Sequence, residues 1–132
     1  MYSLVRRRYS FTTATAVSCQ RQAWGLLKDF PQLDGLYVEH VEFYEEFLSH
    51  VFLADVVRWL ISLFSGTGKG SADGSTGVRL INFIEDAYVY GDLAVKELIR
   101  VSFVENLPHS DQGGFEIHGH LTWNLREIFE RG

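Results

Sequence analysis

The chain contains one cysteine and two prolines, and these low counts restrict its fold and its location. Because Cys19 has no second cysteine to pair with, no disulfide can form within the chain, and a reducing cytoplasm is the expected location. Pro31 and Pro108 are predicted to follow helix ends, since the residue before a proline avoids the helical conformation.

Long hydrophobic runs are also missing. The longest apolar stretch, residues 51–64, is interrupted by Asp55 and Arg58, and it is too short to cross a bilayer. We therefore expect no membrane partner. The same stretch is apolar almost all round, which is typical of a helix at the centre of a bundle.

Basic residues are the third scarcity. The chain has 12 Lys and Arg against 17 Asp and Glu, which gives a net charge of -5. Binding to nucleic acid requires clustered cations that neutralise phosphates, and the one such cluster is Arg6, Arg7 and Arg8. We expect no nucleic-acid partner. Residues 1–12 are predicted to form a flexible basic arm, whose role the sequence leaves open.

The residues that are present indicate an all-α fold. With 132 residues, of which 46% are hydrophobic, the chain is long enough for one domain with one core. We predict a single helical domain over residues 13–132, built as a compact bundle of five to six helices with helical hairpins. Apolar residues recur at helical spacing over residues 13–30, 34–50, 51–64, 78–90, 93–107 and 121–129. Residues 65–77 are rich in glycine and are predicted to form a flexible loop, and residues 115–117 a short extended piece.

The most distinctive segment lies between Asp29 and Asp55, where carboxylates accumulate and no Lys or Arg occurs. The seven carboxylates are Asp29, Asp34, Glu39, Glu42, Glu45, Glu46 and Asp55. On the predicted helix over residues 34–50, Tyr37, Val41, Tyr44 and Leu48 form an inward face. Glu39, Glu42 and Glu46 form the opposite ridge with Glu45 beside it, and Phe43 and Phe47 lie on its flank.

An acidic ridge flanked by aromatic side chains suits a basic protein partner. The predicted partner-binding residues are Glu39, Glu42, Glu45, Glu46, Phe43 and Phe47. A ridge that only keeps the protein soluble is the competing interpretation.

Three further charged residues are predicted to be structural. Asp55 and Arg58 stand three positions apart on one helix, which suits an ion pair. Glu105 falls on the inward face of the predicted helix over residues 93–107, where a carboxylate must find a partner such as Arg58 or shift its pKa.

No motif in the sequence predicts catalytic residues, a bound metal or a cofactor. The string SGTGKGS at residues 65–71 fails the spacing of a phosphate-binding loop. His109, His118 and His120 lack the companions of a usual zinc site and are predicted to be solvated, although metal binding by this loop stays open. His40 and His50 are ten positions apart and are not predicted to share a helix face.

Three segments, residues 50–60, 82–85 and 91–107, resemble a family of short all-helical bacterial proteins of unknown function. Members of that family look like immunity proteins of toxin systems. The resemblance covers roughly residues 36–129. It implies a helical fold, a cognate toxin as partner and no enzymatic activity.

The resulting functional prediction is a cytoplasmic, immunity-type protein that occludes a toxin with its acidic helix face and is not an enzyme. Two alternatives stay open. One is a small metal-dependent or acid/base enzyme centred on Glu105, Asp55 and the loop from His109 to His120. The other is a helical adaptor or oligomerisation domain.

Overall fold

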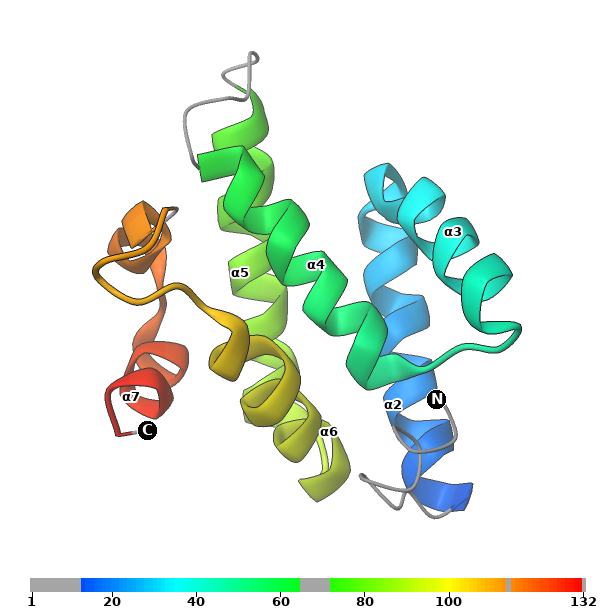
Figure 1. Ribbon diagram of the computed structural model, residues 1–132. Coiled ribbons are helices and arrows are strands. Elements are labelled where there is room, and N and C mark those ends of the chain that lie inside the picture. The colour runs from blue at the N-terminus through cyan, green and yellow to red at the C-terminus, as the bar shows by residue number, and fades with distance from the viewer. Residues whose placement is uncertain (1–12, 65–71, 114, 132) are drawn as a thin grey trace.

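The computed structural model describes residues 13–64, 72–113 and 115–131, and every regular element in these stretches is a helix (Figure 1). The all-α fold predicted from the sequence is confirmed. The arm predicted over residues 1–12 lies outside the described residues. In order, the elements are α2 (Thr13–Asp29), the 3₁₀ helix η1 (Pro31–Leu33), α3 (Asp34–Tyr44), α4 (Ser49–Phe64), α5 (Ala72–Tyr90), α6 (Leu93–Leu98), the π-helix η2 (Ile99–Phe103), the 3₁₀ helices η3 (Val104–Asn106) and η4 (Phe115–His120), and α7 (Trp123–Arg131).

Helix α4 is the centre of the core, as its apolar sequence predicts. It packs against α2, α3, α5 and η2, and Phe52, Val56, Val57 and Leu60 are almost completely buried. In Figure 1 it runs between α5 and α2, with α3 beyond α2 at one end of the molecule and α7 at the other. None of the helices among the described residues is long and apolar enough to cross a membrane.

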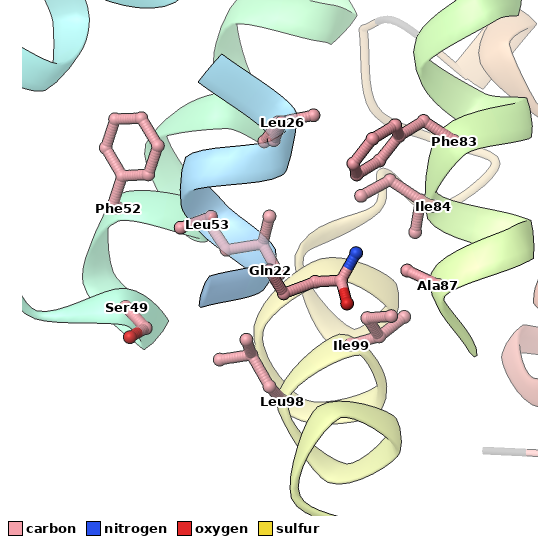
Figure 2. A pocket seen from close by; sticks show the side chains of 11 residues that line it. Gln22, Leu26, Ser49, Phe52, Leu53, Phe83, Ile84, Ala87, Leu98 and Ile99 are labelled. Carbon is pink, nitrogen blue, oxygen red and sulfur yellow. The ribbon is translucent and has the colours of Figure 1, made fainter. Parts of the chain in front are cut away.

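A small cavity lies where α2, α4, α5 and α6 meet. Its volume is about 20 Å³, and Figure 2 shows Leu53, Ala87 and Leu98 among the side chains around it. The walls are almost entirely apolar, so we expect the cavity to be dry. At ~24 cal/mol per Å³ such a void costs only about 0.5 kcal/mol.

Helix α5 begins six residues earlier than the sequence predicts. The glycine-rich loop expected over residues 65–77 is therefore wrong for residues 72–77, while residues 65–71 lie outside the described part of the chain. Packing explains the glycine at position 77. A Cβ atom there would stand 2.5 Å from Cε2 of Phe64, so the missing side chain lets α4 and α5 approach closely.

The chain from Leu93 to Asn106 is helical throughout, as predicted, but its helix type changes from α to π to 3₁₀. Asp92 caps its start, because its Oδ1 accepts a hydrogen bond of 3.0 Å from the Val95 N–H. The residues after the π-turn, Glu105 among them, are rotated about the helix axis relative to their positions in a regular α-helix.

Helix α7 is held by a carboxylate from another helix. Glu85 of α5 accepts hydrogen bonds from the Thr122 hydroxyl (2.5 Å), the Asn124 side chain (2.6 Å) and the backbone N–H groups of Asn124 and Leu125 (3.2 and 3.3 Å).

The extended piece predicted over residues 115–117 is wrong, because this segment forms η4 and buries Ile117 in the core.

Candidate protein-binding surface on helix α3

Helix α3 is shorter than the sequence predicts. It ends at Tyr44, because Glu45 adopts a left-handed backbone conformation with φ 60° and donates its N–H to the Val41 carbonyl at 2.8 Å. The continuous helix predicted over residues 34–50 is therefore wrong after Tyr44. His50 belongs to α4, which begins at Ser49. No glycine or proline marks this end, so the pattern of residues gave no stop signal.

Packing beneath the turn accounts for the break. The ring of Phe47 lies 5.5 Å from the rings of both Tyr37 and Phe52, centroid to centroid, and Leu48 is buried. A continuous helix would carry Phe47 and Leu48 along its own axis instead of under α3. The burial of these two side chains offsets the left-handed residue, which costs about 1–2 kcal/mol for a residue other than glycine.

Two buried histidines lie at the junction of α3 and α4. The Leu48 N–H donates to Nε2 of His40 at 3.0 Å, so the neutral ring carries its proton on Nδ1. Desolvation lowers the pKa of His40, with Asp55 acting in the opposite direction. Desolvation, assisted by His40, lowers the pKa of His50 to about 4. The two histidines share no helix face, since His40 belongs to α3 and His50 to α4, but the turn at residues 45–48 brings the start of α4 beside α3.

The solvent side of α3 carries acidic and apolar side chains together. Phe43 is 77% exposed and Val38 is 49% exposed, and Glu39 and Glu42 are exposed between them on the helix. Helix α3 has no Lys or Arg. We call this surface the α3 face, and it consists of Asp34, Val38, Glu39, Glu42, Phe43 and Glu45.

The structure places two predicted ridge residues elsewhere. Glu46 and Phe47 follow the end of α3 and are half-buried, and Phe47 packs on the core. The ridge geometry predicted for Glu46 is wrong, because that geometry requires the helix to continue. Val38 was not predicted as a surface residue. Its position between the exposed acids Asp34 and Glu42, each four residues away, could have indicated that it faces solvent.

The other predicted polar residues do not form a shared site with the α3 face. Asp55 and Arg58 form an ion pair along α4. The inward position predicted for Glu105 is wrong. Its side chain is 61% exposed, with Oε2 3.9 Å from Nη1 of Arg100 rather than near Arg58. The wider π-turn before it displaces the helical register, and a shift of one residue rotates a side chain by about 100°.

Of the three histidines predicted to be solvated, His109 and His120 are exposed and His118 is half-buried. A ring nitrogen of His118 lies 2.7 Å from the Pro108 carbonyl oxygen, and the ring packs on Phe115 and Phe129 with centroids 4.3 Å apart in both cases. His120 is exposed and stacks on Phe64 at 4.6 Å. Across the described stretches of the chain, no group of three or more His, Cys, Asp or Glu side chains is arranged to hold a metal ion.

Cys19 is buried, and its environment does not favour a nucleophile. Burial, together with Asp92, raises the pKa of the thiol to about 11. The reactive thiolate is therefore scarce at neutral pH.

The family model described as "Domain of unknown function (DUF7674)" matches residues 25–131, and the chain belongs to this family. The searches of curated proteins and of solved structures give no significant match.

Proposed function

We propose that this protein is a binding module whose α3 face docks onto a basic surface of another protein, and that it is not an enzyme. The observation that carries the proposal is the exposure of Phe43, at 77%, on a helix with exposed carboxylates and no cation. A large aromatic side chain on the surface of a folded domain gains free energy when a partner covers it.

The two kinds of side chain on the α3 face have different tasks in this proposal. Phe43 supplies affinity, because buried aromatic anchors dominate interface energies at about 2–4 kcal/mol each. Glu39 and Glu42 accelerate association with a basic partner and select against acidic ones. The packed core beneath α3 keeps the helix in place before binding, which reduces the entropy lost in the complex.

The finer proposal is that the partner is a cognate bacterial toxin, which the protein neutralises in the cytoplasm by covering a basic cleft such as a nuclease active site. The resemblance to toxin-system immunity proteins supports this choice, as does the charge of the α3 face. The family description names no function and supports membership alone.

The test combines partner binding with surface variants. The product of the neighbouring gene in the host is the first candidate partner to measure, by calorimetry and by stopped-flow association. We expect Phe43→Ala to weaken binding about 30-fold or more, and the double reversal Glu39→Lys, Glu42→Lys to slow association about tenfold.

The matched control is the double reversal Glu127→Lys, Glu130→Lys, which has the same spacing on exposed positions of α7. It should leave binding unchanged, because α7 lies at the other end of the molecule (Figure 1). Equal effects from both double reversals would mean that only the net charge of the protein matters for association. That result would overturn the assignment of the α3 face as the docking surface.

A further inference from the structure

A cleft of about 550 Å³ lies at the end of the molecule away from the α3 face. Its walls come from α5, from the segment η2–η3 and from α7, three parts of the chain that the fold brings together (Figure 1). We call it the α7 cleft. Its volume is within the range of about 300–1,000 Å³ that is typical of small-molecule sites.

One side of the α7 cleft is apolar. Val104, Ile128 and Phe129 line it, with Val104 almost completely buried and the other two half-buried and packed on the core. The ring of His109 lies 5.7 Å from that of Phe129 and extends this surface. Such a wall accommodates an aliphatic or aromatic body of modest size.

The rim of the cleft is polar, and its cations outnumber its anions. Arg100 and Arg131 line it together with one carboxylate, Glu105, and with the phenol of Tyr88. Glu97 and Glu127 contact these two arginines from outside the lining and offset part of their charge. What the cleft offers an anion is therefore guanidinium N–H donors on its rim.

Arg100 holds its place without using all its donors. Its Nη2 lies 2.6 Å from Oε2 of Glu97, and its Nη1 lies 3.9 Å from Oε2 of Glu105, beyond hydrogen-bonding distance. A guanidinium has five N–H donors, so donors remain for a ligand. Arg131 is still looser, with a single contact of 3.6 Å to Glu127.

The backbone at the cleft is unusual in a second way. Arg100 lies in the π-helix η2, and Val104 and Glu105 begin the 3₁₀ turn that follows it. Short π-helical segments within α-helices occur frequently at functional sites, where the wider turn redirects side chains. Here the π-turn is what moves Glu105 to the rim, because a regular α-helix would turn it inward.

We propose that the α7 cleft is a binding site for a small amphipathic organic carboxylate. The apolar body lies against Val104, Ile128 and Phe129, and the carboxylate accepts charge-assisted hydrogen bonds from Arg100, with Arg131 closing over it. This inference is independent of the docking surface on α3, since it concerns different residues at the opposite end of the fold.

The test uses the full chain, ¹⁵N-labelled, with 4-phenylbutyrate as the probe. We expect saturable changes in the amide resonances of residues lining the cleft. The neutral analogue 4-phenylbutanamide should bind about tenfold more weakly or worse, because it lacks the charge that Arg100 recognises. Acetate, which carries the charge without the apolar body, should give no saturable change at the same concentrations.

Two variants and one control complete the design. Arg100→Gln and Arg131→Gln should each weaken probe binding, with the larger loss, about tenfold, for Arg100. Arg58→Gln removes an exposed, ion-paired arginine of α4 and should leave binding unchanged. If Arg100→Gln perturbs folding, the highly exposed Arg131 still decides the question.

Several results would overturn the proposal. They are the absence of saturable shifts, shifts that map to the α3 face or to the cavity within the core, equal affinity for the amide, and arginine variants that bind like the wild type. Each of these results would show that the probe does not bind in the α7 cleft or that its carboxylate does not contribute to binding there.

Discussion

The two ends of this molecule are stabilised by different means. Helix α3 rests on a buried group of aromatic rings and two neutral histidines, and it turns a convex acidic face to solvent. Helix α7 buries Leu125 in the core, is capped by the Glu85 carboxylate of α5, and forms one wall of an arginine-lined cleft. The difference teaches that the fold places exposed carboxylates on one end of the chain and arginine side chains at a cleft on the other.

The largest expected effect concerns the packing beneath α3. Phe52 is 1% exposed, with its ring 6.0 Å from that of Tyr37 and 5.7 Å from that of His40. We expect Phe52→Ala to lower the free energy of unfolding by about 3–5 kcal/mol, since it leaves a cavity under α3. Urea titration followed by circular dichroism measures this loss.

Phe43→Ala is the matched control for that variant, because Phe43 is an aromatic residue of the same end but lies outside the core. It should change the free energy of unfolding by less than about 0.5 kcal/mol. A large loss of stability here would mean that Phe43 packs against the fold, and it would weaken the docking proposal.

The second prediction concerns the attachment of α7. Glu85→Ala removes the acceptor for four hydrogen bonds at the start of this helix. We expect a loss of about 2 kcal/mol, since a half-buried cap is removed and its hydrogen-bond donors are left unsatisfied. The exposed neighbour Asp86→Ala should be nearly neutral. Fluorescence of Trp123 with thermal unfolding measures both, and equal effects would contradict a specific cap.

Glu85 also contributes to the acid sensitivity of α7. Burial alone raises the pKa of this carboxyl, but the hydrogen bonds from Thr122, Asn124 and Leu125 together lower it below the ordinary value of 4.5. Its stabilisation is therefore present above pH 4.5 and is lost as the pH falls further, because the unfolded state takes up the proton first. With Glu85→Ala, the free energy of unfolding should depend less steeply on pH in that range.

The third prediction tests the histidine pair at the α3–α4 junction. The pKa of His50 is lowered from 6.5 to about 4, so the unfolded state binds a proton first as the pH falls. The contribution of neutral His50 to the free energy of unfolding should be fully present above pH 6.5. It should fall by about 1 kcal/mol between pH 7 and pH 5.5. His50→Gln should reduce the slope in this range, and an unchanged slope would remove His50 from the explanation.

The smallest effect concerns the acidic face itself. Glu39 and Glu42 are exposed at positions i and i+3, and Glu42 lies in the last turn of α3, where the helix dipole disfavours an acid. We expect Glu42→Gln to raise the free energy of unfolding by about 0.2–0.5 kcal/mol while it slows association with a basic partner. A gain in stability together with slower association would show that Glu42 serves partner binding. An unchanged association rate would favour a role in solubility alone.

Periodicity was enough to predict α2 and the central helix α4, although it missed the first six residues of α5. The apolar stretch from residue 51 identified α4 and its central place, and the recurrence before Pro31 identified α2. Each of these features depends on contacts within one helix or one turn, and such contacts leave a pattern in adjacent residues.

The candidate site was predicted in part. Glu39, Glu42 and Phe43 lie where the helical wheel places them, whereas Glu46 and Phe47 do not, because the wheel assumes a helix that continues. His40 could have been recognised as a buried residue, since it lies between Tyr37 and Tyr44 on the inward side. Its contact with Leu48 could not, because it depends on a turn without a local signal.

The amino-acid sequence by itself determined that this protein is helical, where its prolines end helices and which segment is acidic, because these properties follow from neighbours along the chain. Tertiary structure alone decided the left-handed turn at Glu45, the π-turn before Glu105 and the cap that Glu85 provides. The bond between Glu85 and Thr122 joins residues 37 positions apart. Contacts of this kind exist only after the helices have packed, and packing energy then overrides the local preferences of the residues involved.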